Sequence, residues 1–400
     1  MLNRVSGRPG GRDQDAAIDW VARAREIAPL LADAADRIER ERGIPEPVVA
    51  ALHEAQLFRL LLPRTCDGVE LEPPVYLQVI EEIAKADAST AWCMGQGNGG
   101  SIAAAYLKPE VARAIFGDKR AVAASGPTFG KAVAVEGGYR VSGTWAFASG
   151  MKHAAWLAGH CLVHKADGSA RLDGDGRPFE RTMFFPKERA RLTEIWDVLG
   201  LKGTGSDQFA VNDLFVPADY SYTREWAPDR RETGPLYRFS NYQMFGVAFA
   251  AVALGIARAT LDAFVALARD KTPRGSTQAL RDNALVQFQI GFNEARLQSG
   301  RAFLLQMLHD IWDVTAAGGS PTPEQRLRLR MATTYASHSA REVVDAAYYS
   351  AGATAIFAEN PFERRFRDMH TVSQQVQAHA SNFELVGQSL LGLQPRSKYL

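Results

Sequence analysis

The hydrophobic period of this chain changes twice, and this change limits the possible folds more than any other feature. Apolar residues recur at three- and four-residue spacing before about residue 120 and again after about residue 240, as in amphipathic helices. Between these regions, short apolar runs alternate with Gly, Pro and Asp, and the Gly-Gly pair in "VAVEGGYRV" indicates a hairpin. The chain is therefore expected to be an α+β protein, with strands between two sets of helices.

These transitions predict four segments along the chain. They are a flexible tail over 1–13, an N-terminal helical domain over 14–121, a middle β domain over 122–230 and a C-terminal helical domain over 231–400. Four long helices are expected in the last domain, near 245–269, 277–315, 323–350 and 362–392. Because short loops join them, they favour an antiparallel four-helix bundle.

Composition narrows the class of protein. The 400 residues include 46 basic and 45 acidic side chains, so no charge excess favours nucleic acid or an anionic membrane as a partner. No signal-peptide pattern and no uninterrupted apolar run of membrane-span length are present. The three cysteines, Cys66, Cys93 and Cys161, are widely spaced and odd in number, which predicts reduced thiols and a cytoplasmic location. The eight histidines show no metal-binding spacing, so no metal site is expected.

Two glycine-rich motifs are ambiguous without their context. "GQGNGG" at 95–100 satisfies the dinucleotide-binding pattern, but that pattern requires a strand before it and a helix after it. Because the preceding segment is helical, we expect a helix break near a pocket instead. "GLKGTGS" at 200–206 is either an anion-binding nest of backbone N–H groups or a simple β-turn.

The stretch "RDMHTVSQQVQAH" at 367–379 holds two histidines and no helix breaker. If it lies on one helix, Asp368, Val372, Val376 and His379 share a mostly apolar face that packs against other helices. His379 would then be either a core histidine with one hydrogen bond or a polar donor aimed into an apolar pocket. Arg367 and Asp368 would form a structural ion pair or provide charges near the start of the helix.

Four segments in the correct order resemble the acyl-CoA dehydrogenase superfamily. They are "GGYRVSGTWAFASG", "WDVLGLKGTGSDQFAVNDLFVP", "AAVALGIARATLDA" and "SAGATAIFAENPFERRFRD". The resemblance covers nearly the whole chain after the tail. It implies an N-terminal helical domain, a small middle β-barrel and a C-terminal four-helix bundle, assembled as a homotetramer.

The residues that dehydrogenation needs are missing from the matched positions. The family removes a proton with a carboxylate base, and the count from Arg367 and Asp368 places Val376 at one position of that base. The other position, on the first bundle helix, has no acid before Asp262. Glu384 is a poor substitute, because it lies well past His379 on the expected helix. A dehydrogenase with an unrecognised base remains the alternative function, and a non-catalytic scaffold subunit is a second alternative.

"QVQAHASN", together with the W-x-F-x-S-G pattern, is similar to the reduced-flavin monooxygenase branch of the superfamily. That resemblance implies an oxygenase component that takes reduced FMN or FAD from a separate NAD(P)H:flavin reductase. It uses O2, through a C4a-hydroperoxyflavin, to oxygenate a small aromatic or heterocyclic substrate. Such an intermediate needs a water-excluding site with a few donors.

The resemblance also implies roles for individual residues. His379 is expected on the peroxide or substrate side, and Ser149 is expected to bond near flavin N5. Trp92 and Val376 are expected to line the substrate cavity. The remaining candidates for flavin contact are Phe147, Trp196, Gly203, Thr204, Gly205, Ser206 and Arg274. For Phe147 and Trp196 the alternative is an ordinary aromatic core, and for Arg274, which would reach a phosphate across a subunit boundary, it is a solvated loop.

Overall fold

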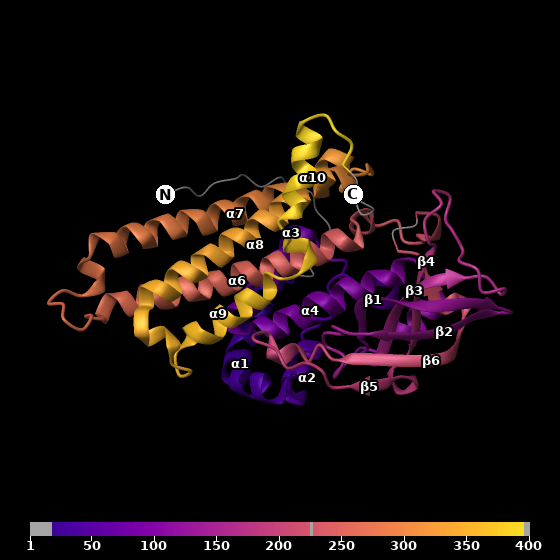
Figure 1. The fold of residues 1–400 in the computed structure, drawn as a ribbon, viewed down its shortest axis with the longest axis horizontal. Helices are drawn as coiled ribbons and strands as arrows, with labels where there is room; N and C mark the ends of the chain where they lie inside the picture. Colours follow the sequence, from indigo (N-terminus) through magenta and orange to yellow (C-terminus); the bar gives the residue numbers. More distant parts are fainter. Residues whose placement is uncertain (1–17, 225–226, 396–400) are drawn as a thin grey trace.

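The computed structural model describes residues 18–224 and 227–395, and the predicted tail over 1–13 lies outside them. Its first part is helical, as predicted. The helices are α1 (Trp20–Glu41), α2 (Glu46–Glu54), α3 (Pro73–Ala86), α4 (Ala88–Ser101) and α5 (Pro109–Phe116). The carboxylate of Asp19 caps α1 by accepting from the N–H groups of Val21 and Ala22. In Figure 1, α1, α2 and α4 lie below the long helices and next to the sheet.

The middle of the chain forms one seven-stranded sheet. Its strands are β1 (Ala123–Val135), β2 (Gly138–Trp145), β3 (Trp156–His164), β4 (Glu180–Pro186), β5 (Arg191–Thr193), β6 (Gln208–Pro217) and β7 (Ser221–Tyr222). Their order in the sheet is β5-β6-β2-β1-β3-β4-β7, and only the β1–β3 pair is parallel among the described pairs. The two edge strands do not pair, so the sheet is open and the expected barrel is wrong.

The predicted hairpin is confirmed. Val135 pairs with Gly138, so Glu136 and Gly137 form a two-residue loop, and Gly137 has the positive φ of 75° that such a turn requires. Behind it, the buried Trp145 lies flat on the sheet, because Gly130, Gly143 and Gly159 leave room for its ring. Its indole N–H donates to the carbonyl of His160, 2.9 Å away, and thereby fixes the middle of β3.

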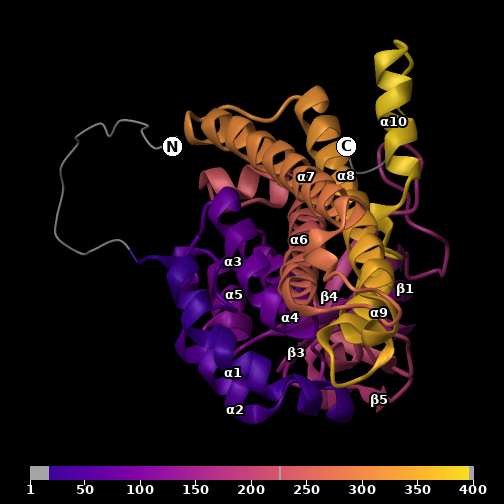
Figure 2. The same cartoon turned by 90° about the vertical axis from the view of Figure 1, so that its left-hand side faces the viewer.

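The C-terminal region contains the long helices α6 (Asn241–Asp270), α7 (Ala284–Ala316) and α8 (Pro323–Ala351). Figures 1 and 2 show them side by side, with the sheet near one end of the group. α6 is long and apolar enough to cross a membrane, but 83% of its most apolar window is buried inside the protein. It is accordingly the central core helix, in contact with α3, α4, α8 and α9.

The predicted helix over 362–392 is wrong, because the chain leaves helical geometry in its middle. α9 (Pro361–Val372) ends with Ser373 as its C-cap residue, and α10 (Ser381–Leu390) begins after a short 3-10 turn over Val376–Ala378. α10 projects away from the other helices in Figure 2. The break follows from side-chain competition, because the Gln375 side chain accepts from the N–H of Gln377 and so replaces a helical bond. The fourth long helix of the expected bundle is therefore two short ones.

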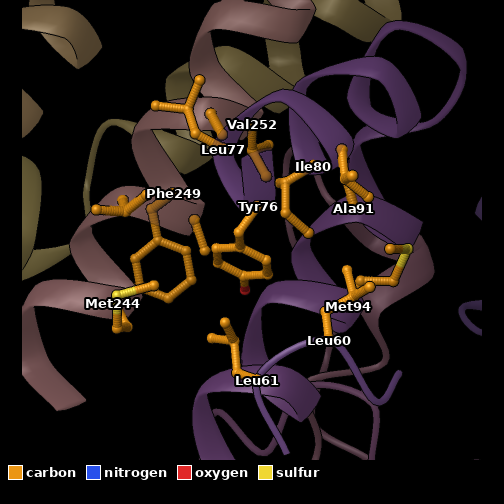
Figure 3. Close-up of a cluster of buried hydrophobic side chains, with 14 of the residues drawn as sticks. Leu60, Leu61, Tyr76, Leu77, Ile80, Ala91, Met94, Met244, Phe249 and Val252 are labelled. Carbon is orange, nitrogen blue, oxygen red and sulfur yellow. The ribbon is translucent and has the colours of Figure 1, made fainter. Parts of the chain in front are cut away.

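One continuous core joins the two helical regions. Tyr76, Leu77 and Ile80 of α3 belong to the same buried cluster as Phe249 and Val252 of α6, and Figure 3 shows these side chains together. A separate cluster around Trp145 fills the sheet, and a third lies at the far end of the long helices. Because the largest cluster includes residues on both sides of the sheet segment, the predicted domain boundaries at 121 and 230 stay predictions.

The glycines of "GQGNGG" serve helix packing. Residues 95–100 are helical throughout, within α4, so the expected helix break is wrong. A Cβ at Gly99 would overlap the ring of Phe245, and one at Gly95 would lie 2.9 Å from the Cβ of Ala248. The absent side chains therefore let α4 approach α6 closely.

A similar close approach gives a test of the core. A Cβ added at Gly255 of α6 would lie 2.5 Å from the carbonyl oxygen of Glu81 on α3. We expect Gly255→Ala to lower the free energy of unfolding by about 1–3 kcal/mol, because backbone atoms must shift. The measurement is thermal or urea unfolding followed by circular dichroism.

Gly387→Ala on α10 is the matched control, since a Cβ there meets no atom within 4 Å. We expect it to be neutral or slightly stabilising. Equal effects of the two substitutions would show that α3 and α6 do not pack as closely as described.

Candidate active site

A cavity of about 440 Å³ lies where the helices meet the sheet. α4 and α6 form one side, the start of β1 and the loop 196–206 form another, and the segment after α9 closes a third. This volume is within the range of sites for small organic molecules. The described lining contains no Asp or Glu side chain, and Arg224 is its one charged group.

Aromatic rings make the helical side of the cavity. Trp92 of α4 stacks on Phe249 of α6, with ring centres 4.0 Å apart and an angle of 11° between the planes. Phe245 extends the same wall one turn earlier on α6. Because Phe249 also belongs to the core in Figure 3, this wall is anchored in the interior and has little freedom to move. Trp92 thus lies in the cavity wall, and its expected contact with substrate stays a prediction.

Three hydroxyl groups form a hydrogen-bonded row on the sheet side. Ser149 Oγ lies 3.0 Å from the indole nitrogen of Trp92 and 2.6 Å from Ser206 Oγ. Ser206 Oγ lies 2.7 Å from Thr204 Oγ1, which is 2.8 Å from the carbonyl oxygen of Leu201. All three hydroxyl-bearing residues line the cavity and are buried. Segments far apart in the sequence thus meet in one polar line.

The "GLKGTGS" segment forms a compact turn that supports this row. Lys202–Thr204 is a 3-10 helix, and Leu201 and Gly205 flank it with positive φ angles of 52° and 48°. Cβ atoms at Gly203 and Gly205 would collide with Ile38 and with the backbone at Arg42. These two glycines therefore face α1, and the structure does not place them in the cavity lining.

Phe147 and Trp196 stand at the rim of the cavity. Their rings meet edge to face at 5.9 Å, and both line it. Phe147 has a φ of 60°, which non-glycine residues rarely adopt, and 56% of its surface is exposed. An aromatic ring held exposed by unfavourable backbone geometry presents an apolar face that a planar ligand would cover. This position disagrees with an ordinary aromatic core for Phe147.

The wall formed by the last turn of α9 and the segment after it is rich in glutamine. Its lining side chains are Thr371, Gln374, Gln375, Val376 and Gln377. The buried amide of Asn382 donates to the carbonyl oxygen of Gln377, and the Thr334 hydroxyl donates to the same atom, each over 3.0 Å. These bonds hold an otherwise irregular segment against α8.

His379 does not lie in the cavity. The imidazole is exposed, and its Nδ1 lies 2.8 Å from the hydroxyl of Ser381. The predicted apolar stripe is wrong, because the helix on which it depended ends at Val372. Val376 lines the cavity, with 63% of its surface exposed, and its expected contact with substrate stays a prediction. Glu384 is exposed as well and bonds to Gln388.

The histidine that does line the cavity is His160, which sequence reasoning missed. Its Nδ1 lies 2.8 Å from Thr182 Oγ1, and burial, with a smaller effect of Arg224, lowers the pKa of the imidazole well below its usual value. The alternation of side chains between the two faces of β3 could have identified His160 from the sequence. Leu157, Cys161 and Val163 face the core of the sheet, so His160 points to the opposite face, toward the helices.

Arg274 lies exposed in the loop between α6 and α7 and is absent from the cavity lining. Its predicted role across a subunit boundary concerns a second chain and stays a prediction. The described residues hold no group of three or more His, Cys, Asp or Glu side chains that could bind a metal ion.

Arg367 and Asp368 clamp the loop that leads to the hydroxyl row. Asp368 Oδ1 accepts from the N–H of Leu201 over 2.6 Å, and Arg367 donates to the carbonyl of Leu199 over 2.9 Å. Arg367 also forms ion pairs with Glu39 and Glu363. Burial raises the pKa of the Asp368 carboxyl to about 7, with the hydrogen bond from Leu201 opposing this effect.

Comparison with known proteins agrees with this architecture. Residues 14–109 and 247–380 match the families described as "Acyl-CoA dehydrogenase, N-terminal domain" and "Acyl-CoA dehydrogenase, C-terminal domain". Indole-3-acetate monooxygenase from Pseudomonas putida is 30% identical over 364 residues, which cover 90% of this chain and 91% of the relative. This chain belongs to the flavin-dependent monooxygenases of the acyl-CoA dehydrogenase superfamily.

A further relative has the same type of name, and a solved structure shares the fold. The flavin-dependent monooxygenase oxygenase subunit HsaA from Rhodococcus jostii is 29% identical over 367 residues. The matched region covers 89% of this chain and 92% of the relative. The structure of XiaF from Streptomyces sp., solved with FADH2 and glycerol, superposes with a TM-score of 0.87 at 25% identity. It covers 95% of this chain and 97% of that one. For a monooxygenase, the absence of a carboxylate from the described cavity lining is expected, because no α-proton has to be abstracted.

The buried carboxyl of Asp368 gives a test of the clamp. Between pH 4 and pH 7, the unfolded chain has already lost this proton whereas the folded chain retains it, so the folded state loses relative stability as pH rises. Asp368→Asn keeps the acceptor oxygen and removes the ionisation. We therefore expect the stability of the variant relative to the parent to rise across this window, on the order of 1–3 kcal/mol.

The measurement is the thermal midpoint of both proteins from pH 4.5 to 8, with Asp197→Asn as control because the Asp197 carboxylate is 83% exposed. A pH dependence shared by both variants would contradict the assignment to Asp368.

Proposed function

We propose that this chain is the oxygenase component of a two-component monooxygenase that receives reduced FMN or FAD from a separate NAD(P)H:flavin reductase. The observation that carries the proposal is the cavity itself. It combines aromatic walls, a buried hydroxyl row and no described carboxylate, within the fold of monooxygenase relatives. When bound, reduced flavin supplies the electrons that activate molecular oxygen, so that one oxygen atom enters the substrate and the other leaves as water.

The described residues fit a flavin ring. Phe147 and Trp196 offer apolar surface at the rim, and Ser149, Thr204 and Ser206 offer polar contacts to ring nitrogen or oxygen atoms. In the proposed arrangement these residues orient the ring, and the stacked pair Trp92–Phe249 excludes water from the opposite side. Gly203 and Gly205 act only by shaping the turn that carries Thr204 and Ser206.

The substrate is proposed to be a small aromatic or heterocyclic molecule, which stacks on Trp92 and Phe249. Relatives are named for indole-3-acetate and for resorcinol. Arg224 is the charged member of the described lining and lies at the same end as His160, and it also pairs with Glu180 over 3.9 Å. A guanidinium group can bind a second carboxylate beside the first, so a ring with an acidic side group is favoured. Burial keeps His160 neutral, so this imidazole would act as a hydrogen-bonding partner and not as a second cation.

A homotetramer is part of the proposal. Leu285, Phe288 and Phe292 form an exposed apolar face on α7, and the two phenylalanine rings stack on each other. Burial of this face against other subunits would remove apolar surface from water. Arg274, at the start of the loop before α7, would then be placed to reach a flavin phosphate in a neighbouring subunit. We further propose a cytoplasmic location without a membrane or nucleic-acid partner, which agrees with three buried, free cysteines.

To test the function, the protein, reduced flavin and indole-3-acetate are first combined without air. This solution is then mixed with buffer that contains ¹⁸O₂. We expect product with one ¹⁸O atom from indole-3-acetate, and a lower KM for this acid than for indole because of Arg224. The measurement is mass spectrometry of the product together with the rate of flavin oxidation. Bleaching of oxidised flavin by an acyl-CoA without oxygen would instead identify a dehydrogenase. If neither reaction occurs, the result would favour a non-catalytic scaffold subunit.

His379 is proposed to deliver a proton at the mouth of the cavity. It lies three residues after Val376, which lines the cavity, and the segment around it must turn inward for the imidazole to arrive. We expect His379→Ala to lower the yield of product per flavin oxidised at least about 10-fold, with hydrogen peroxide released instead, since general acids contribute ~10²–10⁴-fold.

The exposed His309 on α7 provides the control variant His309→Ala. The readout is the ratio of peroxide to product after one turnover. If His379→Ala couples oxygen to product as well as the parent does, the proposed role of this residue is wrong.

A further inference from the structure

The hydroxyl row between Trp92 and Leu201 has fixed ends. An indole N–H can only donate a hydrogen bond, and a backbone carbonyl oxygen can only accept one. Trp92 Nε1 lies 3.0 Å from Ser149 Oγ at one end, and Thr204 Oγ1 lies 2.8 Å from the carbonyl oxygen of Leu201 at the other. The polarity of the hydroxyl groups between them is therefore constrained by both ends.

Only one arrangement of the three hydroxyl hydrogens makes every contact in the row a hydrogen bond. The hydrogen of Thr204 must point to the carbonyl oxygen of Leu201. The contact of 2.7 Å between Thr204 and Ser206 then needs the hydrogen of Ser206. The contact of 2.6 Å between Ser206 and Ser149 in turn needs the hydrogen of Ser149. Every hydroxyl hydrogen in the row is thus engaged within the protein.

This arrangement determines what Ser149 can offer a ligand. Its oxygen accepts from Trp92 and donates its hydrogen to Ser206, so only acceptor capacity remains for a bound molecule. Burial strengthens the constraint, because 6% or less of Ser149, Thr204 and Ser206 is exposed and water has little access to the row. A ligand N–H is therefore favoured beside Ser149 Oγ, and an unprotonated ring nitrogen is disfavoured.

The two redox states of a flavin differ in this property. The reduced ring carries an N–H group at a central nitrogen that is a bare acceptor in the oxidised ring. We propose that Thr204, acting through Ser206, presents Ser149 Oγ as an acceptor and thereby makes the cavity bind reduced flavin in preference to oxidised flavin. This inference rests on the proposed function, and it assigns Thr204 as a positioning residue that acts at the far end of the row.

An oxidised flavin that accepts from Ser149 would cost the row one hydrogen bond. Either the contact between Ser149 and Ser206 is left without a hydrogen, or the whole row reverses. In the reversed row, the hydrogens shift by one step toward the ligand. Ser149 would turn its hydrogen to the ligand, Ser206 would donate to Ser149, and Thr204 would donate to Ser206. The hydrogen bond from Thr204 to Leu201 would then be lost in a buried site. A net protein hydrogen bond contributes about 0.5–1.5 kcal/mol, which corresponds to a preference of roughly 2- to 10-fold. In either case the cost arises because Thr204 accepts from Ser206 while it donates to Leu201, so Thr204 is the residue to change.

The matched pair Thr204→Val and Thr204→Ser tests this inference. Valine has the shape of threonine without the hydroxyl, so the row loses its fixed end and Ser149 can turn either way. Serine keeps the hydroxyl and should retain the parental preference. The measurement is the dissociation constant of FMN and of FAD in oxidised and in reduced form, the latter without air, by fluorescence or absorbance titration.

We expect the ratio of the oxidised to the reduced dissociation constant to fall about 2- to 10-fold in Thr204→Val and to stay within about 1.5-fold of the parent in Thr204→Ser. Phe147→Leu is the control for general damage, since loss of ring contact should weaken both redox forms by a similar factor. An unchanged ratio in Thr204→Val, or an equal change in the serine variant, overturns the inference.

The outcome is separable from that of the proposed function. If neither redox form of flavin binds the parent protein, the proposed function fails and this inference fails with it. If the parent binds both forms with the same affinity yet forms oxygenated product, the proposed function stands and only the polarity of the row is rejected.

Discussion

The contact between the Asp368 carboxylate and the N–H of Leu201 is the constraint on which the site depends. It joins α9, in the helical region, to the loop that carries Thr204 and Ser206 beside the sheet. Arg367 holds the same loop through the carbonyl of Leu199, and a Cβ at Gly200 would overlap the backbone of Arg367. Because a buried carboxyl is costly, its raised pKa is the energetic consequence of placing an acid where it fixes the two parts of the cavity.

The cavity walls are rigid where their side chains also pack in the core. Phe249 belongs both to the packed interior of Figure 3 and to the cavity wall, where it stacks on Trp92. Trp145 fixes the backbone at His160. Its indole N–H donates to the carbonyl oxygen of His160, and its ring packs on three glycines. The segment after α9 is different, since it is held by side chains such as Asn382 and not by a regular element. Of the walls, this one has the least backbone pairing of its own and is the most suited to move.

The chain shows how one fold can serve different chemistry. A dehydrogenase of this architecture needs a carboxylate base in its cavity, whereas the described lining here provides aromatic rings, hydroxyl groups and glutamines. The acids near the cavity have structural tasks instead, as in the clamp by Asp368 and in the Asp207 carboxylate that accepts from the N–H groups of Ile195 and Trp196. Function in this family therefore resides in the site and not in the fold.

The sequence by itself determined the order of helices and strands, the hairpin at Gly137 and the absence of the dehydrogenase base at Val376, because periodicity, turn residues and motif spacing are local properties. Through the family resemblance it also gave Trp92, Ser149, Thr204 and Ser206 as candidates, and all four line the cavity, while their roles stay predictions. It could not show that the sheet is open, since strand pairing involves distant partners. It could not show that α9 ends at Val372 either, because the segment after α9 is held by Thr334 of α8, which is distant in the sequence. Only the tertiary structure decided that His160 and Arg224 line the cavity while His379 stays exposed, because which side chains meet depends on how β3, β7 and the helices pack.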